Sequence, residues 1–217
     1  MKLYVKGARL AWAGSLFTAK AKQDDPTSKP KFQGTFIVES TTLAFAGDAN
    51  PDTPAGKQKG YAYAPFKEAL QGGIIRVATE RFAADTNTVL AQLKAQNRLI
   101  LHDGAEKGGK PGYVGNMYFN AGNAIRPMVM SAHGAPVTEQ DGVFYGGCYV
   151  NGIFDLWAGK NAKGQPMAGI ALLGVQFMRD GDRLTGGITA AADDFEAIPQ
   201  AGVEKAAATG EGAKSLF

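Results

Sequence analysis

Short runs of strand type, separated by polar turns, make up most of this chain. The first run covers residues 3–18, and the second covers residues 32–39, where apolar side chains fall at even spacing. Three further runs, rich in aromatic residues, fill the stretch from Tyr113 to Arg183. Alternation with a period of two is the pattern of a strand that buries one face. We therefore expect a mainly β protein.

The run Cys148–Trp157 shows this alternation most clearly. One set of alternate residues is small or apolar and is expected in the core: Cys148, Val150, Gly152, Phe154 and Leu156. The other set mixes aromatic and polar side chains and is expected on a partly wetted surface: Tyr149, Asn151, Ile153, Asp155 and Trp157. By the same reasoning, most phenylalanines of a β-barrel are core residues, and we place four in that class: Phe36, Phe144, Phe154 and Phe177.

Two segments between the strands have helical character. Residues 85–96 predict the best helix, with Val89, Leu90 and Leu93 on one face and Asp85 as its N-cap. Residues 62–70 predict a shorter helix. Strands with one or two inserted helices and long loops favour a small barrel of the OB-fold type. A β-sandwich is the main alternative.

Turn and tail signals complete the outline of the fold. The Asp180-Gly181 pair is typical of the centre of a hairpin turn. Residues 195–217 contain few large apolar residues, which predicts a flexible C-terminal tail. We therefore expect an OB-fold nucleic-acid-binding domain over residues 1–194, followed by that tail.

Charge and composition narrow the classes of function. The formal net charge is +3, but residues 190–217 carry five acids and two bases, so the body is more basic than the total. A basic body is typical of proteins with a polyanionic partner. The N-terminal residues show no continuous apolar segment of a signal peptide, and no apolar run approaches the ~20 residues that span a bilayer. We expect no membrane partner.

Signals for catalysis, metals and cofactors are weak. Cys148 is the single cysteine, and His102 and His133 are the two histidines, too few soft ligands for a structural zinc site. Residues 104–110 spell G-x-x-x-x-G-K, but Pro111 stands where a nucleotide-binding loop needs Ser or Thr. We predict no catalytic residue, no metal and no cofactor.

Aromatic and basic residues are the candidates for binding. Aromatic rings near glycines, asparagines or basic loops are candidates for stacking on unpaired bases: Tyr113, Tyr118, Phe119, Tyr149 and Trp157. Lysines in three loops and arginines near strand ends are candidates for phosphate contacts: Lys20, Lys22, Lys29, Lys31, Lys57, Lys59, Arg76, Lys107, Lys110 and Arg126. A protein that binds single-stranded nucleic acid is the function this pattern favours.

The order and spacing of six motifs resemble the bacteriophage single-stranded-DNA-binding proteins that are built on an OB-fold. The motifs are VKGARLAWAGSLF at 5–17, KFQGTFIVE at 31–39, LHDG at 101–104, YVGNMYFNAGN at 113–123, VFYGGCYVNGIFDLWA at 143–158 and LLGVQFMRDGDRL at 172–184. The resemblance implies sequence-independent binding of single-stranded DNA in phage replication or recombination. We expect duplex DNA to be a weaker partner. It also implies that the protein acts in the cytoplasm of the infected bacterial host.

Proteins of this kind often end in an acidic tail whose terminal aromatic residue docks replication proteins. Leu216 and Phe217 match that terminal position, whereas Lys205 and Lys214 make this tail less acidic than the family pattern. One alternative is a phage structural or assembly β-domain that uses the same aromatic residues for subunit contacts. Another is a duplex-binding or annealing activity on the same fold. An enzyme is not expected.

Overall fold

The structure, a computed structural model, describes residues 1–21, 25–161 and 163–184. The described strands are β1 (Lys2–Lys20), β2 (Lys31–Val38), β3 (Leu43–Ala46), β4 (Ala64–Pro65), β5 (Leu101–Asp103), β6 (Met117–Asn123), β7 (Met128–Met130), β8 (Tyr149–Lys160) and β9 (Pro166–Arg179). The described helices are α1 (Pro54–Gln58), α2 (Phe66–Phe82) and α3 (Thr86–Ala95), with short 3₁₀ turns η1 (Ala83–Asp85), η2 (Gly104–Lys107) and η3 (Glu139–Asp141). The predicted tail, with Leu216 and Phe217, and the predicted boundary at residue 194 lie outside the described residues.

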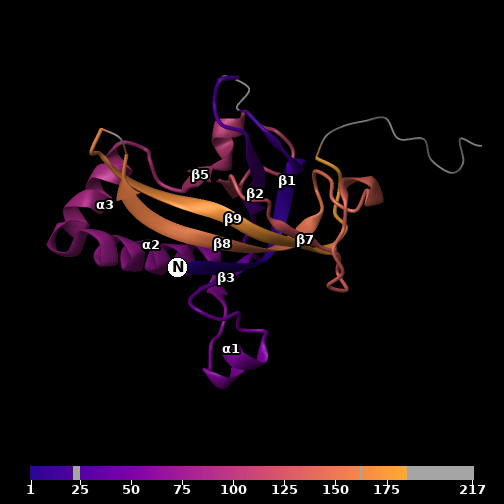
Figure 1. Cartoon of the computed structure of the whole chain (residues 1–217), viewed down its shortest axis with the longest axis horizontal. Coiled ribbons are helices and arrows are strands. Elements are labelled where there is room, and N and C mark those ends of the chain that lie inside the picture. The colour runs from indigo at the N-terminus through magenta and orange to yellow at the C-terminus, as the bar shows by residue number, and fades with distance from the viewer. Residues whose placement is uncertain (22–24, 162, 185–217) are drawn as a thin grey trace, which may run out of the picture. The chain divides into compact units, whose positions relative to one another are not determined.

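A single curled sheet forms the body of the fold (Figure 1). Its strands follow the order β5-β6-β2-β1-β8-β9-β7, and β3 pairs with β1 and β4 off this path. Neighbouring strands are antiparallel, except that β7 runs parallel to β9. The curl brings β6 towards β9, where Asn123 Nδ2 donates to the Leu172 carbonyl at 3.1 Å. Among the described strands, no ladder joins β6 to β9, so the sheet is not closed. The prediction of a mainly β fold of the OB type with inserted helices is confirmed.

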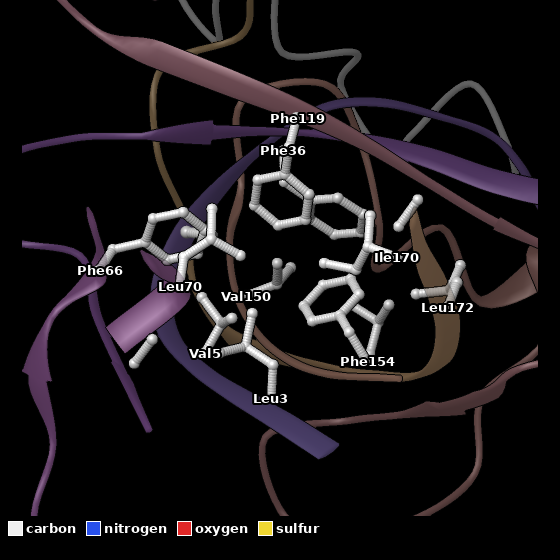
Figure 2. Packing of buried hydrophobic residues seen from close by; sticks show 14 of the residues in the cluster. Leu3, Val5, Phe36, Phe66, Leu70, Phe119, Val150, Phe154, Ile170 and Leu172 are labelled. Atoms are coloured by element: carbon white, nitrogen blue, oxygen red, sulfur yellow. The ribbon is translucent and has the colours of Figure 1, made fainter. Parts of the chain in front are cut away.

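The core lies inside the curl and is built around four phenylalanine rings (Figure 2). The Phe119 ring stacks on both Phe36 and Phe66, with centroid distances of 5.2 and 5.3 Å. Phe154 packs edge-on against Phe36 at 5.0 Å and against Phe119 at 5.2 Å. Such aromatic pairs add about 0.5–1.5 kcal/mol each beyond area burial. The predicted core positions Phe36 and Phe154 are confirmed, and Phe144 and Phe177 pack half-buried at its edge.

The predicted alternation along β8 is also confirmed. Cys148, which precedes the strand, and the alternate residues from Val150 to Leu156 are buried, whereas Tyr149 and Trp157 lie on the outer face. This pattern places the first set against the phenylalanine core and leaves the second set on the surface that faces away from it.

The two longer helices differ in part from the sequence prediction. α2 has 17 residues and extends well beyond residue 70. The sequence pattern does not predict this extension, because the glycine pair 72–73 is unfavourable in a helix. A Cβ atom on Gly73 would lie 2.7 Å from Leu156 Cδ1, so the glycine allows the helix to approach β8 closely. α3 is confirmed, but Asp85 makes no side-chain cap, because η1 leads directly from α2 into α3.

The chain after β9 does not form the predicted hairpin. β9 ends at Arg179, and the described residues that follow turn back onto the sheet and contain no strand. The Tyr145 hydroxyl donates to Asp180 Oδ1 at 2.8 Å, and the Leu184 N–H donates to the Gly146 carbonyl at 2.9 Å. Contacts with a distant loop, rather than a turn between two strands, therefore fix this segment.

Candidate nucleic-acid interface

One row of residues crosses the outer face of the sheet from β5 to β9. The ladder registers pair each member of the row with the next: His102, Tyr118, Ile37, Arg9, Tyr149 and Arg179. Residues paired across antiparallel strands point to the same face, and the residues between them on each strand point to the core. We call these six residues the platform.

Tyr149 and Arg179 form the exposed end of the platform. The Arg179 guanidinium carbon lies 3.4 Å from the centroid of the Tyr149 ring, and that of Arg9 lies 5.7 Å from it. The Tyr149 hydroxyl donates to the Glu39 carboxylate, with oxygen–oxygen distances of 3.0 and 3.1 Å. Stacking of a guanidinium on an aromatic face is favourable and holds the plane in place. The exposed Arg179 therefore presents a flat, charged surface to solvent.

Tyr118 forms the opposite, buried end. Its ring stacks on His102 at 5.3 Å, meets Tyr113 edge-on at 5.4 Å and lies 4.6 Å below the Lys107 ammonium. The Tyr118 hydroxyl donates a hydrogen bond to Glu106 Oε2 at 3.2 Å. Burial raises the pKa of Tyr118 most, and the nearby Glu106 carboxylate raises it further. The side chain is only 5% exposed. The prediction that Tyr118 stacks on a base is therefore wrong.

A small apolar cluster covers the part of the platform formed by Tyr118 and Ile37. Ala11, Ile37 and Tyr118 are buried together, with Tyr113 and Leu184 packed over them. The Leu184 side chain packs closely against the loop backbone at Gly112, since a Cβ atom on that glycine would lie 2.6 Å from a Leu184 methyl carbon. The accessible part of the platform is therefore its Tyr149–Arg179 end.

A second row lies next to the platform on the same face. Trp12, Thr35 and Asn120 are neighbours across β1, β2 and β6, and Trp12 is 42% exposed. The Thr35 hydroxyl donates to Asn120 Oδ1 at 2.7 Å. The Lys20 ammonium lies 6.0 Å from the centre of the Trp12 ring system. This row therefore adds an open aromatic surface with a cation beside it.

The other predicted stacking residues occupy different environments. Phe119 is fully buried in the core, so the prediction that it stacks on a base is wrong. Burial raises the pKa of the half-buried Tyr113. Trp157 is 40% exposed and lies on the outer face of β8, with its indole over Gly169. It is eight residues from Tyr149, or roughly 26 Å along the strand, so the two rings form separate surfaces.

Two of the three predicted basic loops flank the platform and its neighbouring row. Lys20 and Lys31 are partners in the β1–β2 ladder, and Lys29 lies in the connection between them. Lys107 lies over Tyr118, and Lys110 belongs to the same glycine-rich loop. These lysines place positive charge beside the Tyr118 end of the platform and beside the Trp12 ring, where they can pair with phosphates. Lys22 lies outside the described residues.

The remaining predicted cations are not brought to the platform. Lys57 lies on α1 and Lys59 caps it, with Lys59 paired to Asp48. Arg76 lies on α2, which packs on the core side of the sheet, and contacts Met1 Sδ. Arg126 donates to the carbonyl of Phe17 at 3.3 Å. Their predicted phosphate contacts gain no support from this geometry.

Arg9, Arg179 and Trp12 were not among the residues predicted from the sequence. Each lies inside a strand run, where hydrophobic spacing dominates the pattern. A charged residue at an alternate position of an otherwise apolar strand is the signal that marks Arg9 and Arg179 as outward-facing. Arg9 and Arg179 come together at Tyr149 only because of which strands are neighbours in the sheet. The local sequence pattern of each strand does not contain that information.

The described residues offer little for other kinds of site. Within them, no group of three or more His, Cys, Asp or Glu side chains is arranged to hold a metal ion. No helix in the described part of the chain is long and apolar enough to cross a membrane. Burial raises the pKa of the Cys148 thiol, which favours its unreactive protonated form.

Comparison with known proteins agrees with this fold. The single-stranded DNA-binding protein from bacteriophage Enc34, in a structure in complex with ssDNA, matches with a TM-score of 0.57 and 18% identity, over 85% of this chain and 89% of that chain. A second structure of that protein matches with a TM-score of 0.54 and 17% identity, over 90% of each chain. At such identities the likeness concerns the fold alone.

Sequence comparison gives the family. Protein p50 of Acyrthosiphon pisum secondary endosymbiont phage 1 is 37% identical over 141 residues, which are 64% of this chain and 74% of that protein. A family model described as the ssDNA-binding protein of Enterobacter phage Enc34 matches residues 1–207. The chain belongs to the Enterobacter phage Enc34 ssDNA-binding protein family.

Proposed function

We propose that this protein binds single-stranded DNA largely without regard to sequence, in phage DNA replication and recombination within the cytoplasm of the infected host. The observation that carries the proposal is the Tyr149–Arg179 stack beside the open Trp12 ring, on one face of an OB-type sheet. Aromatic and guanidinium planes next to cations are the combination that single-strand binders use. Membership of the Enc34 family supports the same function.

In this proposal, bases stack and phosphates are neutralised on the same surface. A base stacks on the outer plane of Arg179, which Tyr149 supports from beneath, and a neighbouring base stacks on Trp12. Lysines of the two flanking loops contact phosphates: Lys20, Lys29, Lys31, Lys107 and Lys110. The protein binds and releases the strand unchanged, with no catalytic step.

Two further parts of the proposal concern partners. Duplex DNA binds more weakly, because its bases are paired and cannot stack on the exposed planes. Leu216 and Phe217, which lie outside the described residues, dock phage or host replication proteins.

A binding titration tests the proposed function. Fluorescence anisotropy of labelled oligo-dT, repeated at several salt concentrations, should give a log–log slope of about −0.7 per phosphate contacted. A duplex of matched length should compete poorly at the same salt concentration. No binding to oligo-dT at low salt would overturn the proposal and favour a structural or assembly domain. Equal competition by the duplex would favour a duplex-binding activity.

Arg179→Lys separates the stacking plane from the charge. We expect oligo-dT affinity to fall about 2- to 5-fold, the equivalent of about 0.5–1 kcal/mol of cation–π stacking. The slope of affinity against salt should stay unchanged, because lysine keeps the positive charge. Arg76→Lys on α2 is the matched control and should match the wild type in the same anisotropy titration. Unchanged affinity together with an unchanged salt slope would show that Arg179 acts only as a charge.

A further inference from the structure

A cleft of about 270 Å³ opens on the outer face of the sheet, two residues along β8 from Tyr149. Its floor includes side chains of β8 and β9, and its walls come from the segment around α1 and from β7: Asn151, Ile153, Gln176, Asn50, Tyr63, Met128 and Met130. The volume is just below the ~300 Å³ at which drug-sized sites begin. A single planar ring system therefore suits this cleft better than a larger ligand.

The lining of the cleft favours a base over a phosphate. Ile153 and Met128 are 38% and 66% exposed there, an apolar surface that a flat ring can cover. The nearby Lys6 already pairs with Asp52 at 3.0 Å and lies 5.3 Å from the Tyr63 ring centroid. Because the Lys6 charge is already paired with Asp52, the cleft attracts a phosphate only weakly. Its apolar surface suits an aromatic base better.

Three amide side chains line the cleft, and each is held at one end by backbone groups. Asn50 Oδ1 accepts a backbone N–H two residues on at 2.9 Å, and Asn151 Oδ1 accepts the Gly7 N–H at 3.2 Å. Gln176 Nε2 donates to two carbonyls of the loop after β7 at 3.3 and 3.4 Å. Because backbone N–H groups only donate and carbonyls only accept, these contacts assign each amide orientation. Among the residues that the structure describes, no hydrogen bond engages the amide nitrogens of Asn50 and Asn151 or the amide oxygen of Gln176, so these are the ends available to a ligand.

We propose that this cleft binds one pyrimidine base of the strand that crosses the platform, an inference that rests on the proposed function. Thymine and cytosine each present two acceptors and one donor on the pairing edge, which the two donors and one acceptor of the cleft complement. Guanine presents one acceptor and two donors, and adenine presents one acceptor and one donor. A site built to hydrogen-bond one pattern rejects another, because its own polar groups are then left unpaired.

The cleft lies near the platform along β8. Ile153 follows Tyr149 by four residues on the same face of β8, a separation of roughly 13 Å. Asn151 and Gln176 are partners in the β8–β9 ladder and belong to the cleft itself, and Asn151 is only two residues from Tyr149. One OB fold binds about 4–16 nucleotides, so a single strand reaches both surfaces.

Asn151→Asp tests the inference through base preference. The aspartate keeps an oxygen for the Gly7 N–H but replaces the free donor by an acceptor. We expect the preference for oligo-dT over oligo-dA of equal length to fall about 2- to 10-fold, the worth of one hydrogen bond. The added negative charge weakens both oligonucleotides alike and cancels in the ratio. Asn161→Asp, in the β8–β9 turn, adds the same charge away from the cleft and should leave the ratio unchanged.

The possible outcomes separate this inference from the proposed function. If wild type and Asn151→Asp bind with the same dT-to-dA ratio and the same melting temperature, the pyrimidine site is wrong and the platform stands. If Asn151→Asp has a lower melting temperature than the wild type, Asn50→Asp on the cleft wall replaces it as the test, because it makes the same change from donor to acceptor. An unchanged dT-to-dA ratio in Asn50→Asp would then overturn the site. If the wild type binds neither oligonucleotide, the proposed function fails, and the pyrimidine site fails with it.

Discussion

Replacing Phe119 by alanine is expected to lower the free energy of unfolding by about 3–5 kcal/mol. The ring is fully buried between Phe36 and Phe66 and also meets Phe154 edge-on, so its removal leaves a cavity that three large rings border. Urea denaturation followed by circular dichroism measures the loss. The molecules that stay folded should bind oligo-dT as the wild type does.

Phe82→Ala is the matched control for this variant. Phe82 is half-buried at the end of α2, with Arg81 over its ring, so its removal should cost far less stability. If Phe119→Ala kept its stability but lost affinity for oligo-dT, the ring would belong to the binding surface after all, and the assignment of Phe119 to the core would be wrong.

Replacing Tyr149 by alanine is expected to lower oligo-dT affinity by about 1–3 kcal/mol, or about 5- to 150-fold. The ring supports the Arg179 plane and binds Glu39, so its loss frees Arg179 and leaves the Glu39 carboxylate without its hydroxyl donor. Anisotropy titration at one low salt concentration measures the change. Thermal melting should stay close to that of the wild type, because the residue lies on the surface.

Tyr61→Ala controls for the loss of a tyrosine that has a cation over its ring. Tyr61 has the Lys59 ammonium 5.6 Å from its ring centroid and donates to Asp48 at 2.9 Å, but it is not part of the platform. This variant should bind oligo-dT normally. Equal affinity of Tyr149→Ala, Tyr61→Ala and the wild type would remove Tyr149 from the binding surface.

Much of the fold follows from local patterns in the sequence. The alternation along β8 separates Val150 and Phe154 from Tyr149 and Trp157, because a strand with one buried face needs that period. The apolar face of residues 85–96 likewise predicts α3. α2 is less visible, since Gly73 weakens the helical pattern in order to fit against Leu156.

The site is less predictable because it depends on contacts between distant residues. Tyr118 and Phe119 are adjacent, so only one of them can point out of the sheet, and their sequence does not say which. Phe119 points to the core, and Tyr118 points outward, where Leu184, from a segment 66 residues later, covers the cluster to which it belongs. The platform itself joins six strands, and its members become neighbours only through the registers of five ladders.

Photocrosslinking with 5-iodouracil oligonucleotides, followed by mass spectrometry of the crosslinked peptides, tests most directly that unpaired DNA lies on the outer face of the sheet. The account predicts crosslinks in peptides that contain Tyr149 or Trp12, and their loss at high salt. Crosslinks confined to peptides of α2 and α3, on the core side of the sheet, would contradict it.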